Sequence, residues 1–129
     1  MQMAKAPLHL VWYYPVFQGF VLGLLAMLLH EAGHLLAALV LGIKIKSVAL
    51  RWKGLATVRE AGPPDKNLLV SLAGPFTNVL LLLLWHWSPR FGLANLCFAA
   101  VNLLPINGSD GDRALNCLEI MQTESSRQG

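Results

Sequence analysis

The sequence predicts an α-helical integral membrane protein with about three transmembrane segments and a β-hairpin at the membrane surface between the first two. Of its 129 residues, 55% are hydrophobic and 13% are charged, whereas an ordinary soluble domain has about 25% charged residues. The apolar residues form long runs: apart from histidines, residues 8–43 contain one acidic or basic residue, a glutamate, and residues 68–87 contain none. Because a helix needs about 20 apolar residues to cross a bilayer, both runs are long enough. A chain of this length is expected to form one domain, residues 1–129.

The boundaries of the segments follow from aromatic residues, glycine and proline. Tryptophan and tyrosine prefer the interface between membrane and water, so the WYY sequence at residues 12–14 marks an interfacial entry. Gly42 is a typical helix stop, and Pro105 breaks the third apolar run before a stretch of turn-forming residues. The expected elements are, in order, an interfacial N-terminus (1–15), a first span (16–42), a hairpin and loop (43–67), a second span (68–87) and a third, broken segment (91–122).

The connection formed by residues 43–67 is expected to contain the hairpin. It begins IKIK, in which apolar and basic residues alternate with the period of a strand, and Gly54 provides a turn. This connection and the C-terminal tail carry most of the basic residues. The positive-inside rule therefore places both in the cytoplasm and the N-terminus outside. We expect a prokaryotic cytoplasmic membrane protein whose basic residues face the lipid bilayer, and the net charge of +3 requires no nucleic acid as partner.

Three polar residues interrupt the first apolar run. His30 and His34 are four residues apart, so on a helix they project from one face and can bind one metal ion. Glu31 lies about 100° around the helix from His30. This is the HExxH pattern, in which the histidines hold Zn²⁺ and the glutamate is the general base. The alternative is a structural hydrogen-bonded cluster between helices, but burying a glutamate at the centre of a span costs at least about 2.5 kcal/mol, which favours the metal site.

A catalytic zinc site normally has three protein ligands and one open position, so a further side chain must complete it. His9 and His86 lie beside interfacial aromatic residues, and Asp65 belongs to a proline-rich loop. Asp110 and Asp112 follow the break in the third segment, where irregular backbone can enter the membrane if it lines a cavity. Taken alone, the turn-forming stretch favours solvated aspartates in a cytoplasmic turn. The residues by themselves leave the third ligand open.

Three stretches of the chain, in this order, resemble the motifs of the site-2 protease family of intramembrane zinc metalloproteases: HEAGH (30–34), AGPFTN (73–78) and NLLPINGSDG (102–111). The likeness extends over about residues 20–115 and suggests a minimal core of that family. It implies that His30, His34 and Asp110 bind one Zn²⁺ and that Glu31 is the general base. The family usually has a leucine before the aspartate and a second glycine where Asp112 stands, so Asp112 is the alternative third ligand.

The resemblance also implies roles for other residues of these motifs. Asn78 and Asn102 would line the site, where they could orient substrate or hydrogen-bond the developing oxyanion; hydrogen bonding between helices is an equally good explanation of each. Pro75 and Pro105 would interrupt their helices and open room for substrate, or simply kink them. The neighbouring glycines of the two motifs would have a structural role, and these are Gly74 and Gly111.

The expected function is that of a zinc metalloendopeptidase that hydrolyses peptide bonds of transmembrane protein substrates within the bilayer. An oligomer is compatible with the sequence. Two alternatives remain: a catalytically inactive scaffold of the same fold that binds a partner helix, and a membrane protein that binds or transports a metal. Glu31 separates these functions, because only the protease needs a general base.

Overall fold

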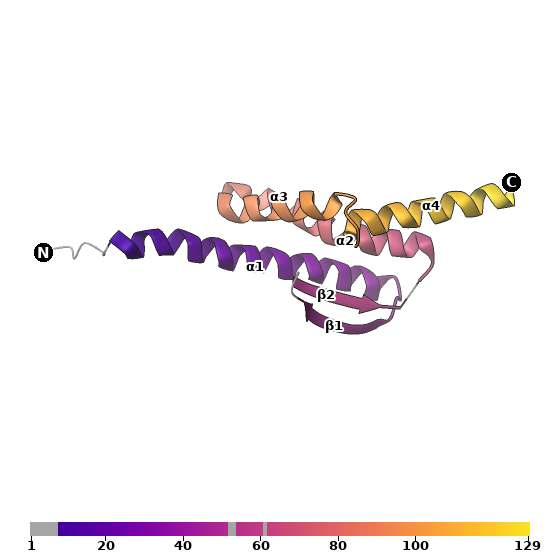
Figure 1. Cartoon of the computed structure of the whole chain (residues 1–129), viewed down its shortest axis with the longest axis horizontal. Helices are drawn as coiled ribbons and strands as arrows, with labels where there is room; N and C mark the ends of the chain where they lie inside the picture. The colour runs from indigo at the N-terminus through magenta and orange to yellow at the C-terminus, as the bar shows by residue number, and fades with distance from the viewer. Residues whose placement is uncertain (1–7, 52–53, 61) are drawn as a thin grey trace, which may run out of the picture.

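The computed structural model describes residues 8–51, 54–60 and 62–129 (Figure 1). Residues 1–7 of the expected interfacial N-terminus, and the side chains of His9, Trp12 and Tyr13, lie outside the described part. The elements, in chain order, are α1 (Leu8–Val40), β1 (Ile45–Arg51), β2 (Gly54–Arg59), α2 (Pro64–Leu81), the 3₁₀ helix η1 (Leu82–His86), α3 (Pro89–Leu103) and α4 (Asp110–Gln128).

The helix α1 is longer than the first expected span. It is 33 residues long and contains Pro15 in its interior, although the first span was expected to begin at residue 16. Membrane helices tolerate such a proline because neighbouring groups satisfy the freed carbonyl. The helix α1 ends where Gly42 was expected to stop it. Gly42 has φ +74°, Gly42 N donates to Leu39 O, and Ile43 N donates to Ala38 O. These two bonds form a Schellman motif, which requires a left-handed residue best supplied by glycine.

Two helical stretches of the described chain are long and apolar enough to cross a membrane, Tyr14–Val40 and Pro64–His86. Their apolar side chains are largely uncovered: Phe20 is 70% exposed, Leu36 65% and Val40 76%. A water-soluble core helix would bury such residues, whereas a helix surrounded by lipid leaves them outward. The third stretch, α3, has 15 residues and measures about 22 Å, less than the ~30 Å hydrocarbon core. A third crossing therefore stays a prediction.

The helices pack through small residues. The helix α1 packs against α2 and α3, and α2 also packs against α4. At Gly33, an added Cβ would lie 2.2 Å from Thr77 Oγ1 and 2.8 Å from Ala73 O, so α1 and α2 approach more closely than any larger residue permits. This close approach brings α2 directly over the histidine face of α1.

The strands β1 and β2 pair antiparallel, from Ile45 opposite Arg59 to Arg51 opposite Gly54, with one irregularity between Ile45 and Ser47. Figure 1 shows this sheet beside the C-terminal half of α1, at the end of the molecule away from the N-terminus. Its location at a membrane surface stays a prediction.

A turn separates α3 from α4. The chain leaves α3 in an extended conformation at Leu104, as expected before Pro105, and reverses at Gly108 with φ +83°. Ser109 then caps α4 by accepting a hydrogen bond from Asp112 N at 3.1 Å. The sequence predicted a broken segment over residues 91–122, but it did not predict that the part after the turn is a long polar helix ending at Gln128. The cap fixes the position of Asp110, the first residue of α4.

Candidate metal site

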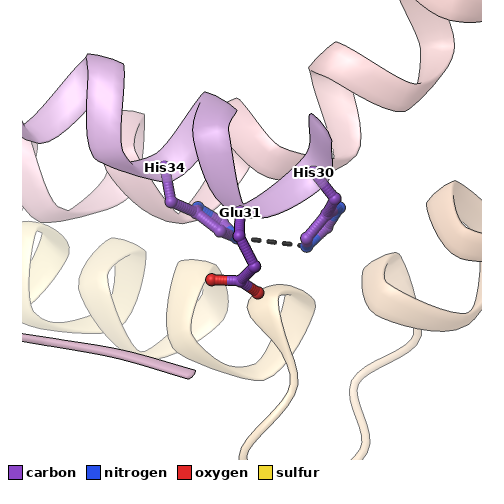
Figure 2. Close-up of side chains that lie close together, drawn as sticks. All are labelled: His30, Glu31 and His34. Carbon is purple, nitrogen blue, oxygen red and sulfur yellow. Dashed lines mark hydrogen bonds between the residues drawn. The ribbon is translucent and has the colours of Figure 1, made fainter. Parts of the chain in front are cut away.

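The histidines of the first motif meet inside the helix bundle. His30 and His34 are one helical turn apart on α1 and are 3% and 4% exposed. Figure 2 shows their rings and the side chain of Glu31 on the same side of the helix. The Nε2 atoms of the two rings are 3.2 Å apart, and the ligand atoms of the three residues all lie within 4.8 Å of one another. The helical period alone accounts for this grouping.

The turn after α3 brings Asp110 to the same point. Asp110 Oδ2 lies 2.9 Å from His30 Nε2 and 3.2 Å from His34 Nε2. Asp112 is directed elsewhere, because its Oδ2 accepts a hydrogen bond from Gly108 N at 3.0 Å. The structure thus brings Asp110, the aspartate implied by the family resemblance, to the histidine pair, and not the alternative Asp112.

The outer nitrogen of each ring faces a hydrogen-bond acceptor. His34 Nδ1 lies 2.6 Å from Val70 O, a carbonyl oxygen, so it must donate. His30 Nδ1 lies 2.5 Å from Asn78 Oδ1. A neutral imidazole has one N–H, so a ring that donates from Nδ1 carries a lone pair on Nε2. Both lone pairs are therefore directed at the space shared with Asp110 Oδ2.

This donor set fits a metal ion. With both rings neutral, two imidazole lone pairs and a carboxylate oxygen converge, and three acceptors at this spacing need a shared cation, either a metal ion or a proton on an imidazole. Ligand atoms that share a tetrahedral zinc at about 2.0–2.2 Å are separated by about 3.3–3.6 Å. The three separations here, 2.9, 3.2 and 3.2 Å, are close to that range. The outer hydrogen bonds to a carbonyl and an amide are also the usual supports of metal-binding histidines.

Gly74 allows α2 to lie against the two rings. A Cβ added to Gly74 would lie 2.3 Å from His34 Nε2 and 2.7 Å from His30 Nε2. Any side chain at this position would therefore occupy the space beside the ligand atoms. The structural role expected for Gly74 is thus a close approach of helix backbone to the site.

The remaining motif residues differ in their relation to the site. Asn78 is fully buried and contacts His30, whereas Asn102 Nδ2 donates to Phe98 O in its own helix. Contact of either asparagine with substrate stays a prediction. The helix α2 continues through Pro75, where an interruption was expected, because one missing N–H does not end a helix held by neighbours. Gly111 packs against the end of α3: an added Cβ would lie 2.2 Å from Leu103 O.

Sequence reasoning missed Asn95. This residue of α3 is fully buried, and its Oδ1 accepts a hydrogen bond from Asn78 Nδ2 at 2.8 Å. The available signal was a lone amide in an uncharged apolar segment, since polar residues at membrane depth are costly and often functional.

Comparison with known proteins identifies the family of this chain. Residues 3–105 match the family model described as Peptidase M50B-like. The chain belongs to this family, the site-2 protease family. One similar protein, from Synechocystis sp., has the provisional name of a zinc metalloprotease and is 31% identical over 85% of this chain and 35% of its own length. Another is a zinc metalloprotease of Methanocaldococcus jannaschii, which is 26% identical over 77% of this chain and 33% of its own length. The chain thus spans about a third of the length of these two relatives.

Proposed function

We propose that this chain is the zinc-binding catalytic core of an intramembrane metalloprotease that hydrolyses peptide bonds in membrane-spanning proteins. The observation that carries the proposal is the convergence of His30 Nε2, His34 Nε2 and Asp110 Oδ2, with both histidines donating outward from Nδ1. Membership of the peptidase family supports the reaction class, and the names of the two relatives support zinc as the metal.

The position of the site along α1 supports proteolysis inside the membrane. The apolar stretch Tyr14–Val40 contains both histidines, and His30 precedes Val40 by ten residues, or about 15 Å of helix. That is about half the thickness of the hydrocarbon core. A membrane-spanning substrate would present its peptide bonds at this depth after local unwinding.

Each polar residue of the site has a role in this mechanism. His30, His34 and Asp110 hold the metal, and bound zinc supplies an electrophile that polarises the scissile carbonyl and acidifies the attacking water. Glu31 accepts a proton from the water and returns it to the departing amine as the peptide bond breaks. In this proposal the exposed apolar surface around α1 faces lipid, and a lipid-embedded substrate would approach the site across it.

The polarity of the chain supports the proposed orientation. The hairpin and α4 lie at the end of α1 opposite the N-terminus (Figure 1), and this end carries most of the basic residues. Lys66 Nζ donates to Leu41 O at 3.0 Å, which ties the start of α2 to the end of α1. We propose that this end faces the cytoplasm.

The test is to replace Glu31 by glutamine in the whole chain, purified in detergent, and to measure bound zinc and cleavage of a single-span test protein. We expect zinc near one per chain and a loss of cleavage of at least about 100-fold, because general-base catalysis typically contributes 10²–10⁴-fold. The His30→Ala variant is the matched comparison and should lose both zinc and cleavage. A wild type that binds zinc but never cleaves would indicate the inactive scaffold, and zinc movement into liposomes without cleavage would indicate the transporter.

A further inference from the structure

Two buried asparagines connect the metal site to α3. Asn95 Nδ2 donates to Phe91 O, four residues earlier in α3, at 2.8 Å. Asn95 Oδ1 accepts from Asn78 Nδ2 of α2 at 2.8 Å, and Asn78 Oδ1 lies 2.5 Å from His30 Nδ1 of α1. Both asparagine side chains are 0% exposed, so these bonds do not compete with water. The chain of contacts thus passes through three helices before it reaches a candidate ligand.

The donor and acceptor of each hydrogen bond in this series follow from the carbonyl of Phe91, at the end away from His30. Phe91 O can only accept, which assigns the nitrogen of Asn95 to that side and leaves its oxygen for Asn78. The amide nitrogen of Asn78 then has two acceptors, Asn95 Oδ1 and Ala26 O at 3.2 Å. Both N–H bonds of Asn78 are used, so its oxygen faces His30. An amide turned by 180° would direct that oxygen at two other oxygens, an arrangement that is costly in a buried site.

The orientation of Asn78 decides which nitrogen of His30 carries the proton. An amide oxygen at Nδ1 requires the N–H there, and in the neutral ring Nε2 then keeps its lone pair. With the amide reversed, Nδ1 would accept and Nε2 would direct an N–H at Asp110. Only the first tautomer can bind a metal through Nε2.

We propose that Asn95 is a positioning residue that selects the metal-binding tautomer of His30 through Asn78. This inference goes beyond the ligand set and rests on the proposed function only where it concerns zinc. Asn95 contacts neither metal nor substrate in this role. Mutating a residue that hydrogen-bonds a metal ligand typically lowers metal affinity by about 10–100-fold. Asn95 is one residue further from the metal, because it contacts His30 only through Asn78. We therefore expect Asn95→Leu to weaken zinc binding about tenfold.

The experiment uses the whole chain in detergent micelles with ¹⁵N-labelled histidine. The chain has 4 histidines, and the His30 signals are assigned from their loss in His30→Ala. Without metal, and at a pH high enough for the ring to be neutral, wild-type His30 should show a protonated Nδ1 and an unprotonated Nε2. Asn95→Leu should give a mixture of tautomers and, on titration with Zn²⁺ against a chromophoric competitor, the weaker affinity. Adding Asn95→Leu to Asn78→Leu should weaken zinc binding no further, because Asn95 acts through Asn78.

Thr77→Val is the matched control. It removes a hydroxyl that donates to Ala73 O in its own helix at 2.8 Å, one residue from Asn78. Zinc affinity and the His30 tautomer should not change in this variant, whereas general loosening of α2 would alter both. If the Asn95→Leu variant does not fold, the Asn95→Ala variant is used in its place, because it removes the same hydrogen-bond acceptor.

The outcomes separate this inference from the proposed function. A neutral wild-type His30 that carries its proton on Nε2 and not on Nδ1 overturns the inference without any variant, as does a folded Asn95→Leu protein with unchanged tautomer and affinity. A wild type with the expected tautomer that takes up no zinc overturns the proposed function and leaves the assignment of the tautomer intact.

Discussion

Replacing Gly74 by alanine should remove zinc binding while leaving the helices formed. The new Cβ would lie 2.3 Å from His34 Nε2 and 2.7 Å from His30 Nε2, whereas atoms in ordinary contact are about 3.5–4.0 Å apart. One partner must therefore move by about 1 Å or more. The ligand rings cannot yield that far, because metal-ligand distances tolerate about 0.2 Å.

The expected magnitude follows from this displacement. Overfilling a packed site costs about 1–3 kcal/mol, which the bundle can absorb by moving α2 away from α1. That movement would take the backbone of α2 with it, including Val70 O, the acceptor for His34 Nδ1. Losing one hydrogen bond to a metal-binding side chain lowers metal affinity by up to about 100-fold. Because Gly74→Ala would also displace the two rings, we expect its zinc affinity to fall by more than about 100-fold.

The assay is a zinc titration of the detergent-purified chain against a chromophoric competitor, with helix content followed by circular dichroism. Gly23→Ala is the matched control, because a Cβ at Gly23 has nothing within 4 Å, and its affinity should remain within about twofold of wild type. Wild-type zinc affinity in folded Gly74→Ala protein would refute the reasoning. It would mean that the metal does not bind where α2 faces the two rings.

Two further predictions concern the first turn of α4. Asp110→Asn should abolish zinc binding, because it removes the charge of the oxygen nearest both histidines, whereas Asp112→Asn should retain zinc; equal zinc contents measured by mass spectrometry would contradict the assignment. Gly111→Ala should lower the free energy of unfolding by about 1–3 kcal/mol and weaken zinc binding, because its Cβ would lie 2.2 Å from Leu103 O and displace the neighbouring Asp110. A thermal melt and a zinc titration matching those of wild type would contradict this prediction, because they would show that the contact between α3 and α4 accommodates the added methyl group.

Several features of this protein are determined by neighbours in the sequence. The pairing of His30 with His34 needs only the helical period, and the end of α1 needs only a glycine at residue 42 that accepts a positive φ. The end of α3 before Pro105 follows from the local geometry of proline. These interactions reach no more than a few residues along the chain, so the pattern of residue types is enough to predict them.

Other features are decided by contacts between distant segments. Asp110 is 80 positions from His30. The family resemblance favoured it over Asp112, but no local pattern did, and the cap of α4 turns one aspartate toward the histidines and the other toward Gly108. The continuation of α1 through Pro15 and the helix α4 also departed from the local signals of proline and turn-forming residues. Asn95 acquires its partner only when α2 and α3 pack side by side. A hydrogen bond between buried amides depends on the distance and direction of two atoms, and that geometry exists only in the folded bundle.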